Sequence, residues 1–174
     1  MAMRLRKHRQ AAATGETGEL AIEDFLTYRL LTLTNRLNRQ AMGILDKEAS
    51  LRLPEWRCLA FIDKCGNGNG KVSFHRLAEV TGMDRALISR SVQGLLEKGL
   101  VLTERDSADR RVWHASLTRK GGALFQRMLP KMRQRQLHLL DALSPADRKA
   151  IYRIIDRLND AVEAWDDGRP KPRS

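Results

Sequence analysis

Residues 73–117 read SFHRLAEVTGMDRALISRSVQGLLEKGLVLTERDSADRRVWHASL, and this segment carries the strongest local structural signals in the chain. Ser73 is suited to cap a short helix that ends at Gly82, where glycine allows a tight turn. Asp84 is suited to cap a second helix that ends at Gly99. Apolar residues recur at helical spacing in the second helix and predict a core-facing stripe of Ile88, Val92, Leu95 and Leu96. The stretch therefore begins with two consecutive helices joined by a turn.

After Gly99 the pattern changes from a helical period to strand composition. Residues 100–105 and 111–117 are rich in residues that favour β-structure, and residues 106–110 between them, DSADR, are typical of a turn. This pattern predicts a hairpin with Arg110 and Arg111 at its tip. Two helices followed by such a hairpin form a winged helix-turn-helix.

The chemistry of these elements favours DNA as the partner. The face of the second helix opposite the apolar stripe carries hydrogen-bonding and small side chains that could lie against base edges: Arg85, Ala86, Ser89, Arg90 and Gln93. An arginine at the hairpin tip can enter a narrow minor groove. We expect the neighbouring carboxylate of Asp109 to hold that guanidinium in place.

The charge balance agrees with a polyanionic partner. The 174 residues include 32 Lys and Arg against 21 Asp and Glu, which gives a formal net charge of +11 and a pI of about 10.3. Basic proteins also bind membranes or ribosomes, so the charge alone favours nucleic acid only modestly. A chain of 174 residues with 42% hydrophobic residues is long enough and apolar enough to bury a core.

Several short motifs occur in one order along the chain. They are EWR at 55–57, RLA at 76–78, ISR at 88–90, LLEKGLV at 95–101, DRR at 109–111, LTRKG at 117–121 and LSPAD at 143–147. Through them, most of residues 24–165 resembles the MarR family of bacterial transcriptional regulators. The resemblance implies a homodimer that binds a palindromic operator in double-stranded DNA and is released by a small ligand or by oxidation. We favour a repressor over an activator. The chain departs from the family at Thr103, where arginine is frequent, and Arg105 on the same strand face is the expected substitute.

Two long amphipathic helices are predicted at opposite ends of the chain. The first carries an apolar stripe of Leu26, Leu30, Leu33, Leu37, Ala41 and Ile44. The last starts at a capping signal, Ser144-Pro145-Ala146-Asp147, and carries Ile151, Ile154, Ile155, Leu158, Val162 and Trp165. A further helical pattern over 118–143 has an expected kink at Pro130. The stripes either close the core of a monomer or pair with a second copy, and we favour the pair because a rigid dimer would hold two reading helices about 34 Å apart.

The predicted fold is mainly α with a small β-hairpin wing (α+β), a winged helix-turn-helix with a helical dimerisation lobe. Residues 51–118 are assigned to the winged-helix DNA-binding domain, and residues 19–50 and 119–166 to the lobe. Residues 1–18 are predicted to be a disordered basic arm, with DNA phosphates as an alternative binding site for it. Residues 167–174 are predicted to be a disordered basic tail.

The resemblance also implies an effector pocket near the first helix, the helix of residues 55–57 and the start of the Arg119 helix. Arg57 could anchor a carboxylate there, and Tyr28 or Trp56 could stack on an aromatic ring. Phenolic acids and related aromatic carboxylates, or their coenzyme A thioesters, are the implied effectors. The alternative interpretation is that Arg57 belongs to a solvated strip on its helix.

Cys58 and Cys65 fall on one predicted helix, about 10.5 Å apart by axial rise. This separation exceeds the roughly 7 Å between Cα atoms that a disulfide tolerates, so the two cannot pair within an intact helix, although a bond between subunits stays open. We favour buried apolar cysteines over the alternative, a redox-sensing regulator that oxidation releases from DNA.

Other chemistry finds little support in the sequence. The four histidines lack the paired spacing of metal ligands, and no catalytic constellation occurs, so we expect neither an enzyme nor a metal or cofactor site. A membrane partner is not expected, because no stretch approaches the roughly 20 apolar residues of a membrane span. These features predict a cytoplasmic, nucleoid-associated bacterial protein. A winged helix that docks on protein instead of DNA is a further alternative.

Overall fold

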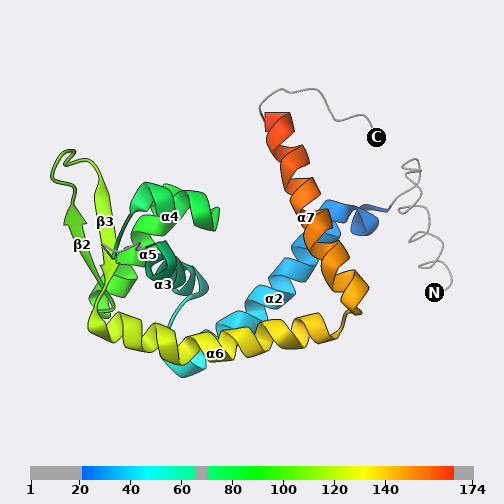
Figure 1. The fold of residues 1–174 in the computed structure, drawn as a ribbon, viewed down its shortest axis with the longest axis horizontal. Helices are drawn as coiled ribbons and strands as arrows, with labels where there is room; N and C mark the ends of the chain where they lie inside the picture. Colours follow the sequence, from blue (N-terminus) through cyan, green and yellow to red (C-terminus); the bar gives the residue numbers. More distant parts are fainter. Residues whose placement is uncertain (1–20, 66–69, 167–174) are drawn as a thin grey trace. The chain divides into compact units, whose positions relative to one another are not determined.

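The computed structural model describes residues 21–65 and 70–166, so both predicted basic tails lie outside the described residues. The elements, in chain order, are η1 (Ile22–Asp24), α2 (Leu26–Ala49), α3 (Leu53–Cys65), β1 (Lys71–Ser73), α4 (Phe74–Thr81), α5 (Arg85–Glu97), β2 (Val101–Arg105), β3 (Trp113–Leu117), α6 (Arg119–Asp141) and α7 (Pro145–Asp166) (Figure 1). The chain divides into two compact units at Met128, within α6. No helix among the described residues is both long enough and apolar enough to cross a membrane.

The two helices predicted from residues 73–99 form with the expected caps. The Ser73 hydroxyl accepts a hydrogen bond from the backbone N–H of Arg76 at 3.1 Å, and the Asp84 carboxylate accepts one from the N–H of Leu87 at 2.7 Å. Gly82 and Gly99 adopt left-handed φ angles of 65° and 68°, a conformation that costs glycine little. These bonds fix the first residue of each helix, and the glycines terminate them.

The core-facing stripe of α5 is shorter than predicted. Ile88, Val92 and Leu95 are at most 1% exposed, but Leu96 is 36% exposed and lies outside the core. Consecutive helix residues point about 100° apart, so Leu96 points away from Leu95. Only Leu95 faces the core. Ser91 completes the buried face, with its hydroxyl donating to the Leu87 carbonyl at 2.7 Å.

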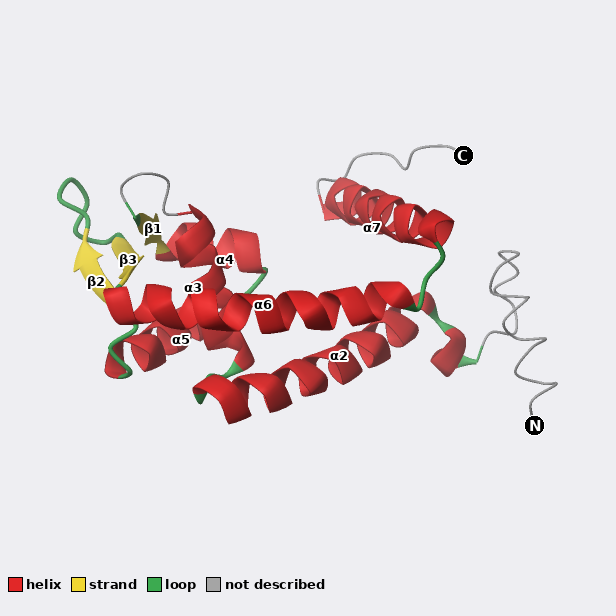
Figure 2. Ribbon diagram, turned by 60° about the horizontal axis from the view of Figure 1, so that its bottom comes forward, coloured by secondary structure: helices red, strands yellow, loops and turns green. Residues whose placement is uncertain are grey.

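The sheet has one strand more than predicted. β2 and β3 form the expected antiparallel hairpin, and β1 pairs with the other side of β3, giving the order β1-β3-β2 (Figure 2). Val72 in β1 lies opposite Ala115, and both are buried. The third strand therefore joins the start of α4 to the base of the wing.

The described core lies entirely in the first unit. Its buried apolar side chains come from the end of α2, from α3, α4 and α5, from the sheet, and from the first turns of α6. The ring of Trp56 on α3 stacks on Phe125 of α6, with ring centroids 5.5 Å apart. This packing places α5 and the wing on one compact body.

The second unit contains the end of α6 and α7. The predicted capping signal is confirmed at the start of α7, where the Asp147 N–H donates to the Ser144 hydroxyl. The Asp147 carboxylate accepts a hydrogen bond from the same hydroxyl at 2.7 Å. The Arg148 guanidinium donates to the Leu140 carbonyl at 2.8 Å and secures the turn. Pro130 lies within α6, which continues as one helix from Arg119 to Asp141.

The start of α6 approaches the turn after α5 very closely. The Thr118 hydroxyl donates to the Gly99 carbonyl at 2.8 Å, and the Thr118 N–H donates to the Leu100 carbonyl at 3.1 Å. A Cβ atom on Gly121 would overlap the Leu100 carbonyl oxygen, whereas one on Gly122 would meet no atom within 4 Å. Gly121 is therefore needed for this helix contact, and Gly122 is not.

We expect Gly121→Ala to destabilise the protein and Gly122→Ala to stabilise it. The first change forces a methyl group against fixed backbone and should lower the free energy of unfolding by about 1–3 kcal/mol or more. The second removes a helix-interior glycine and should raise it by up to about 1 kcal/mol. Urea denaturation of both variants measures the difference, and equal effects would contradict the proposed contact.

Candidate functional site

The reading face predicted on α5 is solvent-exposed. Its members are Arg85, Ala86, Ser89, Arg90 and Gln93, all exposed, while the opposite face of the helix packs into the core. Gln93 donates through Nε2 to the Glu97 carboxylate at 3.0 Å, so the carboxylate orients this amide. The row presents two guanidinium groups, a hydroxyl and an amide from one capped helix, which are groups that can hydrogen-bond to base edges.

The turn at the wing tip is held by hydrogen bonds to two aspartate side chains. The Asp106 carboxylate accepts the backbone N–H groups of Ala108 and Asp109 at 2.8 and 3.0 Å, and these hydrogen bonds lower the pKa of Asp106. Asp109 accepts the backbone N–H of Arg111 at 2.9 Å. The structure thus connects Asp109 to the main chain of Arg111, where the sequence suggested a contact with a guanidinium. Both Arg110 and Arg111 are exposed at the tip.

Arg105 lies at the base of the wing, beside an aromatic pair. Its guanidinium carbon is 5.0 Å from the ring centroid of Trp113, the residue opposite it in the hairpin. Trp113 also contacts Phe74 at the start of α4, with centroids 6.5 Å apart. A cation over an aromatic face is held electrostatically, so Trp113 positions the Arg105 charge on the same strand as Thr103. The sequence did not single out Trp113 for this role.

A buried ion pair ties α5 to the start of α3. Glu55 is 2% exposed, and its carboxylate accepts the Lys98 ammonium at 2.6 Å and the Arg52 N–H at 2.7 Å. The Lys98 ammonium also donates to the Ser50 carbonyl at 2.8 Å, and the Lys120 ammonium donates to the Lys98 carbonyl at 2.7 Å. We call Ser50, Glu55, Lys98 and Lys120 the Lys98 junction.

The Lys98 junction was not predicted from the sequence, although a local signal exists for the bond between Arg52 and Glu55. Pro54 and Glu55 follow the first residue of α3, and a glutamate at the third helical position commonly bonds back to the N-cap N–H. This is the bond that Glu55 makes to Arg52. Lys98, the ion-pair partner of Glu55, is 43 residues away in the sequence, so no short motif predicts this pair.

The three predicted effector residues do not meet within the described chain. Trp56 is 7% exposed and is stacked on Phe125, so its ring is already covered. Arg57 donates to the Asn38 side chain at 3.4 Å, whereas Tyr28 lies ten residues from Asn38, about 15 Å along α2. Among the described residues, Tyr28 therefore lies apart from Arg57 along α2.

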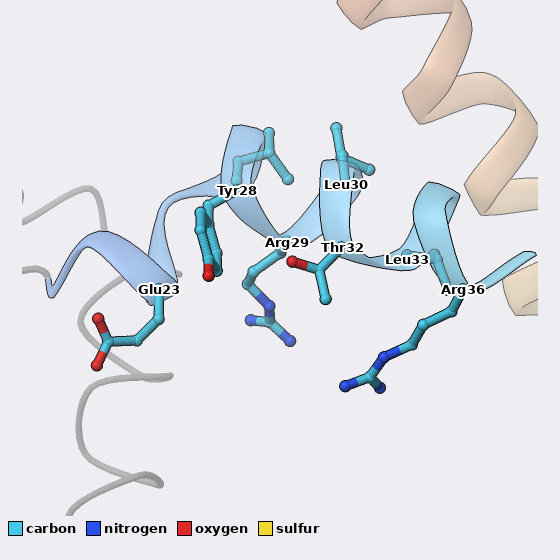
Figure 3. A pocket seen from close by; sticks show the side chains of 8 residues that line it. Glu23, Tyr28, Arg29, Leu30, Thr32, Leu33 and Arg36 are labelled. Carbon is cyan, nitrogen blue, oxygen red and sulfur yellow. The ribbon is translucent and has the colours of Figure 1, made fainter. Parts of the chain in front are cut away.

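Tyr28 instead lines an open hollow on the N-terminal half of α2. The hollow has a volume of about 500 Å³, and its lining includes Glu23, Arg29 and Arg36. Figure 3 shows these three side chains extending to the same side of the helix as Tyr28. The two arginines are additional cationic candidates, and no sequence motif marks either of them.

The two cysteines lie on α3 in different surroundings. Cys58 is fully buried, whereas Cys65 at the helix end is partly exposed, and both are free thiols. Burial raises the pKa of Cys58 from 9.0 to about 12, a hydrogen bond with Ser91 opposes this shift, and the nearby Glu55 carboxylate adds to it. Since the thiolate is the reactive species, this environment favours the structural interpretation for Cys58. Among residues 21–65 and 70–166, no cluster of three His, Cys, Asp or Glu side chains could hold a metal ion.

A capped helix-turn-helix, an exposed polar row and an arginine-tipped hairpin define a winged helix-turn-helix protein. The MarR family model matches residues 49–112. The transcriptional repressor NicR of Pseudomonas putida is 30% identical over 111 residues, which are 63% of this chain and 70% of NicR. The chain belongs to the MarR family and is a DNA-binding transcriptional regulator of that type.

Solved structures share the fold at lower identity. Sco3205, a MarR family regulator from Streptomyces coelicolor in complex with DNA, is 21% identical with a TM-score of 0.73, over 82% of this chain and 89% of Sco3205. BpsR of Bordetella bronchiseptica, whose DNA binding is regulated by 6-hydroxynicotinic acid, is 23% identical with a TM-score of 0.61, over 75% of this chain and 98% of BpsR. The fold therefore extends beyond the segment that the family model matches.

We expect the Cys58 thiol to resist alkylation in the folded protein. In a Cys65→Ser background, iodoacetamide at neutral pH should modify Cys58 only after denaturation, because the native thiol is buried and protonated. Above pH 9 the unfolded chain loses this proton while the folded chain keeps it up to about pH 12, so the Cys58 contribution to stability falls over that range. Rapid labelling of the native protein would contradict this prediction, and Cys58→Ala should lack the alkaline loss.

Proposed function

We propose that the protein is a homodimeric repressor that binds a palindromic operator and is released by a small-molecule effector. The exposed polar row on α5 supports this function most directly. It lies on a helix fixed at its start by Asp84 and at its end by Lys98, so its side chains are presented from a rigid support. A rigid helix of this kind can read bases in the major groove.

Within that proposal, Arg90 and Gln93 have different roles. Arginine can donate two hydrogen bonds to guanine, and glutamine can pair with the edge of adenine. The hydrogen bond from Gln93 to Glu97 occupies one amide donor of Gln93. Arg90 is therefore the residue on which we expect sequence discrimination to depend most.

The wing supplies the proposed contact with the minor groove. Arg110 and Arg111 are exposed on a tip held by the hydrogen bonds of Asp106 and Asp109. Ordering the turn before binding reduces the entropy lost when an arginine enters a groove. Arg105, positioned by Trp113, is the proposed phosphate contact at the wing base.

We expect Arg90→Ala to weaken binding to the operator by about 1–3 kcal/mol and to leave binding to random duplex nearly unchanged. The operator can be recovered by selection from a random duplex library, and affinity for both DNAs can be measured by fluorescence anisotropy. Alanine at both Arg110 and Arg111 is the matched comparison. It should weaken both DNAs and reduce the salt dependence of binding, because phosphate neutralisation is lost. Equal losses on both DNAs for Arg90→Ala would contradict base reading.

The exposed apolar faces of α2 and α7 support the proposed dimer. On α2, Leu26, Leu30 and Leu33 are 41–54% exposed, although Ala41 and Leu45 at the other end of the helix are buried. On α7, the large exposed apolar side chains are Ile151, Tyr152, Ile154, Ile155, Val162 and Trp165. Large apolar side chains exposed along a helix commonly mark an interface.

We expect Ile155→Lys to shift the protein from dimer to monomer in sedimentation velocity, because it places a charge on the apolar face of α7. Asp156→Asn changes the charge by the same amount on the other side of the helix and should leave the dimer intact. Circular dichroism of both variants checks that the helices remain. A monomeric wild-type protein would contradict the dimer, as would equal behaviour of the two variants.

The proposed effector is an aromatic carboxylic acid or its coenzyme A thioester. BpsR, which shares the fold, responds to 6-hydroxynicotinic acid, an aromatic acid. The cationic side chains of Arg29 and Arg36 beside Tyr28, and Arg57 on α3, are candidate partners for a carboxylate. Release would follow if the effector binds the DNA-free conformation more tightly than the DNA-bound one.

A further inference from the structure

Glu97 continues the polar row of α5 one turn beyond Gln93. Ser89, Gln93 and Glu97 are spaced four residues apart, so they lie on one side of the helix, and all three are exposed. Glu97 is therefore a carboxylate on the face proposed to meet DNA. The phosphates repel a negative charge there, which lowers affinity for every DNA sequence alike. A favourable effect of Glu97 at this face must then lie in discrimination between sequences.

Within residues 21–65 and 70–166, Gln93 is the hydrogen-bond partner of Glu97. Nε2 of Gln93 donates to Oε1 of Glu97 at 3.0 Å. The adjacent cation, Lys98, is engaged elsewhere, since its ammonium donates to the Glu55 carboxylate and to the Ser50 carbonyl. Among these residues, the Glu97 carboxylate therefore acts on Gln93.

This hydrogen bond determines which way round the Gln93 amide is held. A carboxylate only accepts hydrogen bonds, so the NH₂ group of the amide faces Glu97. The reversed amide would place Oε1 of Gln93 beside the carboxylate, with no proton between the two oxygens. One N–H and the carbonyl oxygen of Gln93 stay available to a partner. The amide therefore offers one donor and one acceptor in a fixed order.

This donor and acceptor match adenine better than guanine. In the major groove adenine shows an acceptor at N7 and a donor at N6, which pair with the N–H and the carbonyl of a glutamine. Guanine shows two acceptors, N7 and O6, and one of them would meet the carbonyl oxygen of Gln93. A glutamine with two free N–H groups can turn both toward guanine, whereas Gln93 has committed one of them to Glu97.

We infer that Glu97 is a positioning residue that makes Gln93 select adenine over guanine in the operator. The inference rests on the proposed function, because α5 must lie in the major groove. Glu97 itself needs no contact with a base, since it acts through the Gln93 amide. The same bond restricts an exposed side chain before DNA arrives, which reduces the entropy lost on binding.

Direct reading of DNA by Glu97 is the competing role. A carboxylate can accept a hydrogen bond from N4 of cytosine. A preference of that kind would favour cytosine and would not depend on Gln93. The role through Gln93 is favoured because the carboxylate is already bonded to Nε2 in the DNA-free chain.

A duplex library that varies each position of the selected operator tests the inference. Full-length protein is bound to the library, and sequencing of the bound fraction gives the base preference at every position. The Gln93 position is the one whose preference is lost in Gln93→Ala. The test variant is Glu97→Ala, in the wild-type and the Gln93→Ala backgrounds. The control for charge is Asp63→Ala, which removes an exposed carboxylate from α3.

We expect Glu97→Ala to reduce the preference for adenine over guanine at the Gln93 position by about fivefold or more, the lower end of the discrimination that a bidentate base contact provides. Preferences at the other positions should stay as in wild type. Asp63→Ala should keep the whole wild-type profile. In the Gln93→Ala background, Glu97→Ala should change nothing further. Circular dichroism checks that the helices remain in each variant.

The inference and the proposed function fail in different ways. An unchanged adenine preference in Glu97→Ala, the same change in Asp63→Ala, or an effect of Glu97→Ala that persists without Gln93 would overturn the inference. So would a wild-type preference for a base other than adenine at the Gln93 position. Failure of the wild type to prefer any operator over random duplex would instead overturn the proposed function.

Discussion

The ion pair between the buried Glu55 and Lys98 is the contact that fixes the position of α5. The carboxylate is almost inaccessible to water, and a Cβ on Gly94 of α5 would collide with it, so the two helices meet at this point. Removing one partner of a buried ion pair typically costs about 3–5 kcal/mol, because a charge is left unpaired. The cost here is smaller at Lys98, which is one-third exposed. Glu55 therefore restrains α5 at both Gly94 and Lys98.

The two elements proposed to contact DNA, α5 and the wing, are connected through the turn after α5. Gly99 allows the chain to reverse, and Thr118 then bonds the carbonyls of Gly99 and Leu100. β2 begins at Val101 and β3 ends at Leu117, so the same few hydrogen bonds fix the base of the wing and the end of α5. A displacement at Lys98 thus acts on the helix and the wing together.

The sequence was sufficient where the deciding contacts are local. Ser73, Asp84 and Gly99 cap or end their helices through bonds spanning a few residues, so their roles could be predicted. The strand β1 could not, since three residues give almost no pattern and its pairing partner is more than 40 residues away. The burial of Glu55 depended likewise on a distant lysine. The effector residues were grouped by resemblance, and packing against Phe125 took Trp56 out of that group.

For α2 and α7, the sequence predicted the helices but not the surfaces that cover their apolar faces. Their periodicity predicted both helices correctly, yet a stripe does not state what covers it. Ala41 and Leu45 find cover within the first unit, whereas no described side chain of α7 is buried. Helices gain most of their stability from packing such faces, and the apolar face of the 22-residue helix α7 is exposed among the described residues. In the proposed dimer a second copy covers this face, and the stability of this unit then rises with protein concentration.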